Sequence, residues 1–381
     1  MVKAVNYQLK KRLLAISICL IISGLSLYGQ TAKYSNAFLT LGVGAEGLSV
    51  ANTMVAMSDD VTAAYWNPAC LSIMRKKYEL SLMHTEYFAG IAKYDYGAFG
   101  YRIDDQQTVA LTILRFGVDN IPNTTQLIDK EGNINYDRIT YFTAADWGIL
   151  LSYGRSFTQV KGLSFGANFK IVERNIGKFA NCWGFGLDAG LLYEIKKWKI
   201  GLVIKDLTTT FNAWTFHLTS EMEEVFRQTN NDIPQNGLEY TVPSLSFGAG
   251  KNFELGKGFT LEAAIDFDMF FDGERNDVIS GKGVSFAPHA GLEFGIKNIV
   301  FVRAGIGNMQ KEIHLTEDGA PKNAFNCDVN LGIGFCIKDI VSVDYALCNV
   351  GDVGKRKNNA DNISFYSHVF SLKITLDRFK R

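Results

Sequence analysis

Residues 41–71 read LGVGAEGLSVANTMVAMSDDVTAAYWNPACL, and this is the one stretch of the chain without the pattern of a strand, a turn or a tail. Its small residues, Gly44 and Gly47 among them, allow close approach of the backbone. Asp59 and Asp60 stand where they would cap and open a short helix. The residue before Pro68 avoids the helical region, so that helix ends at Trp66-Asn67. We interpret the segment as a compact plug.

An acidic pair for protease chemistry is the alternative interpretation of Asp59 and Asp60. Carboxylates inside a protein need cationic partners, and Arg or Lys residues of a surrounding barrel would supply them. The structural role is favoured.

The composition limits both the class of function and the class of fold. The 381 residues carry no net charge and only 20% charged residues, which gives no electrostatic footprint for nucleic acid. Against just 6 Pro, the 27 Phe, 16 Tyr and 36 Gly favour a large sheet with aromatic faces.

The first residues have the pattern of a secretory signal peptide, 1–29, in which Lys10-Lys11-Arg12 precede the apolar run 13–27. No other run approaches the length of a membrane-spanning helix. We therefore divide the chain into a signal peptide (1–29), an N-terminal hatch (30–76) and a β-barrel (77–381). Removal of the signal leaves five cysteines without CxxC spacing, which predicts small apolar residues rather than a disulfide framework or a zinc site.

From residue 77 onward, apolar and polar residues alternate in segments long enough for a tilted strand to cross a bilayer. The fourteen predicted strands are 78–88, 92–103, 107–116, 146–157, 161–173, 182–195, 198–207, 242–253, 259–271, 285–296, 299–308, 326–337, 340–350 and 363–376.

Alternation alone also fits a soluble sandwich, but the connections favour a barrel. The even-numbered connections are short: 104–106, 158–160, 196–197, 254–258, 297–298 and 338–339. Apart from 89–91, the odd-numbered ones are long: 117–145, 174–181, 208–241, 272–284, 309–325 and 351–362. Short turns at one rim and long loops at the other are typical of outer-membrane barrels. We predict an all-β fold, a 14-stranded antiparallel transmembrane β-barrel with a small N-terminal hatch.

The chain lacks a convincing enzymatic constellation. His84 and Glu86 share one face of the first strand, which we expect to belong to a polar ladder facing the lumen. Gly42-x-Gly44-x-x-Gly47 matches the dinucleotide fingerprint in letters, but it does not follow a strand in a βαβ unit. We expect no enzyme activity and no catalytic, cofactor-binding or metal-binding residues.

The plug carries a family resemblance. Gly44-Ala45-x-Gly47-Leu48, then Val55-Ala56-x-Ser58-Asp59-Asp60, then Ala63-Ala64-Tyr65-Trp66-Asn67-Pro68-Ala69 resembles the hatch of FadL-like barrels, and within them the PorV/PorQ branch. Gly44, Gly47, Asp59, Asp60, Trp66, Asn67 and Pro68 are the hatch residues to which we assign a structural role. Glu46 departs from the pattern, because these proteins usually carry a basic residue there.

The resemblance implies an outer-membrane component of the type IX secretion system in a Gram-negative bacterium. Such a barrel binds the C-terminal signal domains of secreted cargo at the translocon and passes the cargo on. Translocon proteins, cargo domains and outer-membrane lipids would be its partners, with loops 208–241 and 309–325 as contact surfaces. Independently of the resemblance, Thr219 or Ser220 is placed to cap a short helix in the 208–241 connection, which we expect over the barrel mouth.

The alternative is a FadL-type channel for long-chain fatty acids or other hydrophobic small molecules. It predicts an apolar ligand pocket between hatch and barrel, and a lateral opening where a strand is kinked. Pro243 and Pro288 are the two prolines within predicted strands. A structural barrel without transport is a third possibility.

Overall fold

The computed structural model describes residues 33–88, 90–127, 133–315, 321–349 and 367–377, so the predicted signal peptide lies outside the described residues. Fourteen long strands form the barrel: β1 (Tyr78–Tyr87), β2 (Ala92–Arg102), β3 (Gln107–Asn123), β4 (Thr140–Ser156), β5 (Leu163–Ile176), β6 (Ala180–Ile195), β7 (Trp198–Lys205), β10 (Ser244–Gly256), β11 (Phe259–Phe270), β13 (Ser285–Ile296), β14 (Val300–Leu315), β15 (Pro321–Ile337), β16 (Val341–Cys348) and β17 (Ser367–Leu376). Three shorter strands complete the sheet: β8 (Thr210–Phe216), β9 (Gly237–Thr241) and β12 (Ile279–Ser280).

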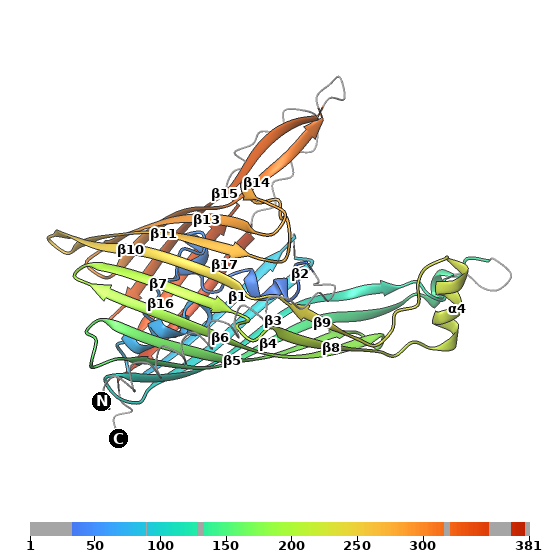
Figure 1. The fold of residues 1–381 in the computed structure, drawn as a ribbon, viewed down its shortest axis with the longest axis horizontal. Helices are drawn as coiled ribbons and strands as arrows, with labels where there is room; N and C mark the ends of the chain where they lie inside the picture. Colours follow the sequence, from blue (N-terminus) through green and yellow to red (C-terminus); the bar gives the residue numbers. More distant parts are fainter. Residues whose placement is uncertain (1–32, 89, 128–132, 316–320, 350–366, 378–381) are drawn as a thin grey trace, which may run out of the picture.

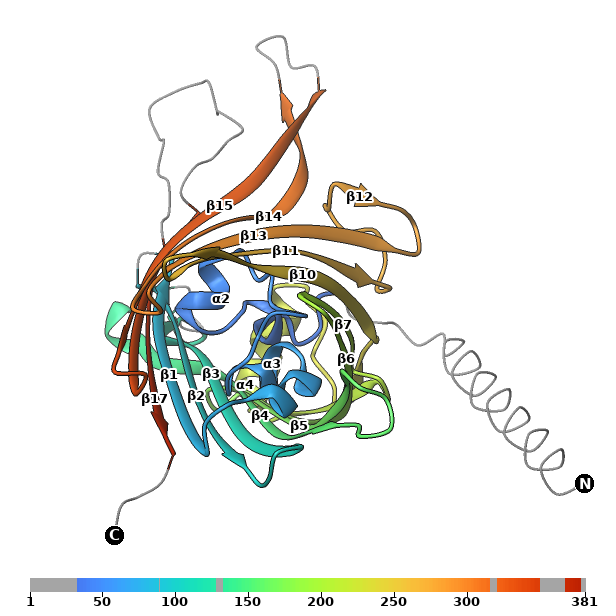
Figure 2. The same cartoon turned by 90° about the vertical axis from the view of Figure 1, so that its left-hand side faces the viewer.

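The barrel is closed by its first and last strands. β1 pairs antiparallel with β17, with Tyr78 opposite Leu376 and Glu86 opposite His368. All other neighbours are antiparallel as well, and Figure 2 shows the resulting ring of strands. Closure removes the edges that an open sheet would expose. The prediction of a 14-stranded antiparallel barrel is confirmed.

The barrel turns apolar side chains outward and polar ones inward, which is the inverse of a soluble protein. In β5, Phe165 and Phe169 are exposed on the outer face, whereas Asn168 and Lys170 are 2% and 3% exposed on the inner face. Asp188 of β6 is buried on the same inner face. An outward apolar surface is stable in the hydrocarbon of a bilayer but not in water. The alternation in the sequence fitted both a soluble sandwich and a membrane barrel, and the burial of the side chains favours the membrane barrel.

The hatch lies inside this ring (Figure 2). It contains four short helices, η1 (Ala37–Thr40), α2 (Ala45–Ser49), α3 (Ala63–Trp66) and η2 (Pro68–Ile73). Most of its side chains are buried, and with apolar barrel residues they form the main core cluster. In the described part of the chain, no helix is long and apolar enough to cross a membrane.

The two rims differ in height. The turns that follow β2, β4, β6, β10, β13 and β15 are short, as predicted, whereas the strands at the other rim run on beyond the barrel. There β14 and β15 form a projecting hairpin, and β3, β4, β8 and β9 form a second extension (Figure 1). The sequence predicted loops for many of the residues in these extensions. They are strands instead, because their cross-strand pairs continue the ladders of the barrel beyond the rim.

The helix predicted in the 208–241 connection exists as α4 (Ser220–Gln228), capped by the hydroxyl of Thr219, which accepts from the Met222 N–H at 3.3 Å. Its expected position over the barrel mouth is wrong. α4 lies at the far end of the second extension, where Gln126 donates to Glu221 at 3.2 Å (Figure 1). The intervening strands β8 and β9 carry it away from the mouth.

The expected lumen-facing position of His84 and Glu86 is also wrong. In β1 the inward residues are Ser81, Met83 and Thr85, and His84 is exposed on the outer face, 2.7 Å from Asp95 of β2. The apolar outer face of β1 ends two residues earlier, at Leu82. Strand parity alone assigns a face but does not say where the apolar band ends, which explains the error.

Candidate functional site

Asn67 and Asp60 fasten the hatch to the barrel wall. Asn67 is fully buried, and its side-chain amide donates to the carbonyls of Val55 at 2.7 Å and Leu191 of β6 at 3.1 Å. Its oxygen accepts from the Ala69 N–H at 3.1 Å. One side chain therefore joins two turns of the hatch to the wall.

Asp60 accepts from Lys373 of β17 at 2.7 Å and from the Thr62 N–H at 2.8 Å. The expected barrel cation is thus present. The helix expected to begin at residues 58–60 instead begins at Ala63, because Asp60 closes a turn on Thr62 before the first helical residue. Asp59 has a different cationic partner, Arg75, at 3.1 Å. The two carboxylates do not form an acidic pair.

Gly47 of the hatch motif packs closely with Trp66, and Pro68 packs closely against the barrel wall. A Cβ atom on Gly47 would lie 2.8 Å from the ring of Trp66, so only glycine fits there. Gly44 has φ +76° immediately before α2, a conformation that glycine adopts without strain. Pro68 opens η2, and its carbonyl carbon would lie 2.1 Å from a Cβ on Gly166 of β5. The hatch backbone lies directly on the inner wall.

Glu46, the residue that departs from the family pattern, faces barrel cations. Its carboxylate lies 3.6 Å from Arg303 of β14 and 3.8 Å from Lys373. Arg303 is 4% exposed and also binds Asp344 at 2.6 Å. A basic residue at position 46 would meet two cations here, so an acidic residue suits this barrel.

Two neighbouring strands of the wall are interrupted at the same level. β7 and β8 both pair with β6, in the registers Ala189 to Ile204 and Phe185 to Phe211. Three residues of β6, 186–188, therefore lie opposite six residues, 205–210, and Asp206 and Thr209 have left-handed backbones (φ 55° and 62°). The next strand breaks between β9, which ends at Thr241, and β10, which begins at Ser244.

Pro243 lies in that second break, where its missing N–H costs the ladder nothing. Pro288, the other candidate, remains within β13 opposite Phe267. β11 ends at Phe270 opposite Ser244, and among the described residues β9 pairs with β8 and has no strand on its other edge. The wall is discontinuous between β9 and the end of β11.

A buried ion cluster holds the kinked wall in shape. Lys170 of β5 lies 2.5 Å from Asp206 in the break and 3.0 Å from Asp188 of β6. The Asp206 N–H donates to Asp188 at 2.9 Å. The ammonium therefore compensates two carboxylates that burial would otherwise destabilise.

Among the first described residues of the hatch, 34–36 cross the discontinuity. The hydroxyls of Ser35 and Thr241 lie 2.7 Å apart, and Asn36 donates to Thr241 at 2.9 Å. On the other side, the Tyr34 N–H donates to Asp272, beyond the end of β11, at 3.1 Å. Asp272 also accepts two hydrogen bonds from Arg275, at 2.7 and 2.9 Å. Burial acts to raise the pKa of Asp272, but the bonds from Arg275 and Tyr34 outweigh it and hold that pKa below its usual range.

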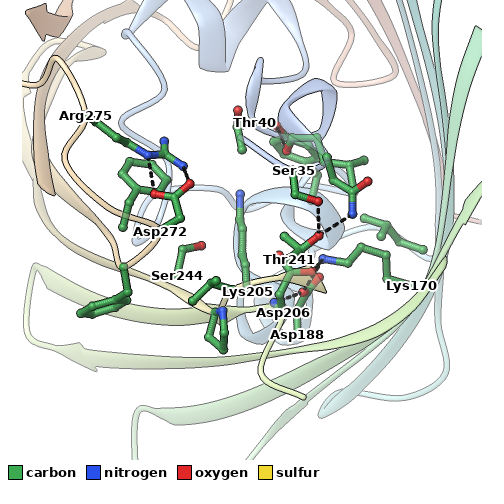
Figure 3. A pocket seen from close by; sticks show the side chains of 18 residues that line it. Ser35, Thr40, Lys170, Asp188, Lys205, Asp206, Thr241, Ser244, Asp272 and Arg275 are labelled. Carbon is green, nitrogen blue, oxygen red and sulfur yellow. Dashed lines mark hydrogen bonds and ion pairs between the residues drawn. The ribbon is translucent and has the colours of Figure 1, made fainter. Parts of the chain in front are cut away.

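Two adjoining cavities lie behind this crossing segment. The smaller, about 60 Å³, is lined by both breaks, with Lys205 pointing into it between the Arg275–Asp272 pair and Thr241 (Figure 3). The larger, about 420 Å³, lies between the hatch and β10 to β15. Thr40, Tyr65, Lys205, Ser244, Phe270 and Arg275 line both cavities.

The larger cavity is less apolar than expected. Tyr65 and Trp66 of the hatch, Tyr87 of β1 and Phe270 of β11 give it aromatic surfaces, but Asp268, Asp277, Asp328, His289 and several amides line it as well. The sequence singled out Trp66, which lines this cavity, and Pro243, which lines the smaller one. It did not indicate the polar lining, since these residues come from strands far apart along the chain.

The fold defines a class: a membrane β-barrel with an internal hatch and an interrupted wall, which is the FadL-like fold. Solved structures of other proteins share this fold, among them a hydrocarbon channel and a toluene transporter. The chain aligns with the CymD monoaromatic hydrocarbon channel over 89% of its own length and 98% of that chain, with 14% identity and a TM-score of 0.52. It aligns with the P. putida toluene transporter TodX over 89% and 99%, with 13% identity and a TM-score of 0.50. No protein-family model and no curated protein sequence matches the chain.

Proposed function

We propose that the protein is an outer-membrane channel of a Gram-negative bacterium that admits small, largely hydrophobic molecules through the interrupted wall. The observation that carries this proposal is the coincidence of two strand breaks, at 206–209 and 242–243, with a cavity that continues over the hatch. A hydrophobic solute dissolved in the bilayer reaches such a wall directly. It then enters without crossing the polar surface layer.

Three further features support the channel. Aromatic side chains line the larger cavity, as is usual for small-molecule sites. The hatch fills the barrel below the cavity, so an entering molecule is held there rather than lost through an open pore. The fold is shared with a monoaromatic hydrocarbon channel and a toluene transporter.

In this proposal the segment 33–40 covers the wall break and has to move for a molecule to enter. Locking it tests the function. Because the Ser35 and Thr241 hydroxyls lie 2.7 Å apart, the double variant Ser35→Cys/Thr241→Cys places two sulfurs where a disulfide forms. Uptake of ethylbenzene into proteoliposomes should fall several-fold in the oxidised variant and recover on reduction. The two single variants serve as controls, and normal uptake by the oxidised protein would contradict the proposal.

The second candidate is the type IX secretion role, in which the barrel binds cargo C-terminal signal domains at the translocon. The hatch motif supports it, and so do the two extensions beyond the rim, which offer surfaces for a protein partner. Replacing 217–236 with a short linker removes α4 but keeps β8 paired with β9. Loss of cargo-domain binding would favour secretion, and retained binding with intact secretion would rule out this surface.

A further inference from the structure

Three residues that line the larger cavity carry buried polar atoms without a hydrogen-bond partner in the described part of the chain. Asp277 is 9% exposed and lines the cavity, and its Oδ2 accepts no hydrogen bond from any residue that the structure describes. Trp66 Nε1 and Asn52 Oδ1, which line the same cavity, are likewise without a hydrogen-bond partner in the described part of the chain. A buried carboxylate oxygen without a partner is costly, so such groups are usually satisfied by an ion, water or ligand.

The backbone around Asp277, which lines the cavity, is held by pairing with β14. Its segment is added to β14 through backbone bonds on both sides, from Val278 to Met309 at 2.9 Å and from Lys311 to Asn276 at 2.7 Å. An isolated bridge joins Asp277 itself to Gln310. The backbone that carries the carboxylate is therefore fixed before any ligand arrives, which lowers the entropic cost of binding.

The charges around the cavity favour a cationic ligand. Three carboxylates line it, those of Asp268, Asp277 and Asp328, against the cations Lys205 and Arg275. Arg275 is already paired with Asp272 at 2.7 Å, and its guanidinium lies 3.6 Å from the centre of the Phe270 ring.

The remaining charged groups are partly engaged. Asp268 lies 3.2 Å from His289, and Asp328 accepts from Asn308 at 2.7 Å. Lys205 lies over the Tyr65 ring at 4.8 Å, at the junction with the smaller cavity. The carboxylate of Asp277 is thus the buried charge best placed to receive a ligand.

Acidic and aromatic groups come from different elements. The acids are on β11, on the segment after it and on β15, whereas Tyr65 and Trp66 belong to the hatch and Tyr87 to β1. We propose that the cavity selects molecules with an aromatic or apolar body and a protonated amine, the amine binding Asp277 and the body lying against the aromatic side chains. This inference rests on the proposed channel function and names its substrate class.

The test compares three molecules of similar size and different head group. Phenethylamine carries a cation at neutral pH, phenylacetate an anion, and ethylbenzene no charge. In titration calorimetry of the full-length protein in detergent, we expect phenethylamine to bind about tenfold more tightly than ethylbenzene, as a charge-assisted hydrogen bond would give. Phenylacetate should bind most weakly. This comparison uses the unaltered protein and does not depend on the folding of a variant.

A substitution then tests whether the amine of phenethylamine binds Asp277. Asp277→Asn keeps the shape and removes the charge, so phenethylamine affinity should fall about tenfold while ethylbenzene affinity stays unchanged. The matched control is Asp105→Asn, at a carboxylate that is 99% exposed in the turn between β2 and β3. Equal affinity for phenethylamine and ethylbenzene, tighter binding of phenylacetate, or an Asp277→Asn variant that behaves as the unaltered protein would each overturn the proposal.

Measuring uptake as well as binding distinguishes a failure of the amine selectivity from a failure of the proposed channel function. If ethylbenzene enters proteoliposomes but the amine has no advantage in binding, the selectivity inference fails and the channel stands. If none of the three molecules binds or enters, both fail.

Discussion

Substitution of Asn67 by Ala should loosen the hatch without unfolding the barrel. The variant loses three hydrogen bonds, to Val55, Leu191 and Ala69, at 2.7, 3.1 and 3.1 Å. At about 1 kcal/mol for each bond, the local stability of the hatch should fall by about 3 kcal/mol. The barrel ladders remain intact because the substitution removes only side-chain atoms.

Hydrogen–deuterium exchange measures this local opening directly. A loss of about 3 kcal/mol corresponds to roughly a hundredfold faster exchange in peptides covering residues 54–70. Peptides from β3 to β5 should keep their protection. Asn231→Ala, the same change at an exposed loop position, is the matched control.

Two results would refute the reasoning. Unchanged exchange in the hatch would mean that Asn67 does not fasten it. A matching rise in exchange in the barrel strands would mean that hatch and wall unfold together, in which case the three bonds cannot be assigned to a local unit.

Three further predictions concern the wall, the packing and the crossing segment. Lys170→Met leaves the buried Asp188 and Asp206 without their cation, so thermal denaturation should show a loss of about 3 to 5 kcal/mol; an unchanged melting temperature would mean that the kink needs no ion cluster. Gly166→Ala places a methyl group 2.1 Å from the Pro68 backbone and should destabilise the protein by about 1 to 3 kcal/mol, whereas Gly283→Ala, which meets nothing within 4 Å, should be neutral in the same assay. The pKa of Asp272 is lowered in the folded protein, so its bonds to Tyr34 and Arg275 contribute stability above the unfolded pKa of about 4 and lose it as pH falls through the lower folded value. Exchange at residues 33–40 should therefore be constant from about pH 5 to 8 after correction for intrinsic rates and rise in strong acid, and Asp272→Asn should abolish that dependence.

The barrel was predictable because two physical constraints act on every strand. Side chains alternate between faces, and each strand must span the same bilayer, so length and period repeat fourteen times. The hatch segment differs from the strands in the sequence, because its glycines, Asn67 and Pro68 interrupt the two-residue period. The strand period and its interruption in the hatch each depend on residues close together in the chain, so the sequence alone reveals them.

The candidate site was only partly predictable. Pro243 marked one wall break, but the break at 206–209 looked like the end of a strand followed by a loop. β8 and β9 were hidden in that loop, because seven and five residues of alternation give a weak signal. The cavity joins Asp277 to Trp66, and no local pattern relates residues so far apart.

The close fit between the hatch and the inner wall also constrains how the molecule is assembled. The hatch backbone lies against glycines of β5 and β6, while Asp60 reaches Lys373 on the last strand and Val61 donates to Glu79 on the first at 2.9 Å. A hatch threaded into a finished barrel would have to slide past walls that leave no room for a single methyl group. We therefore expect the strands to wrap around the hatch, with the joining of β1 to β17 as the step that encloses it.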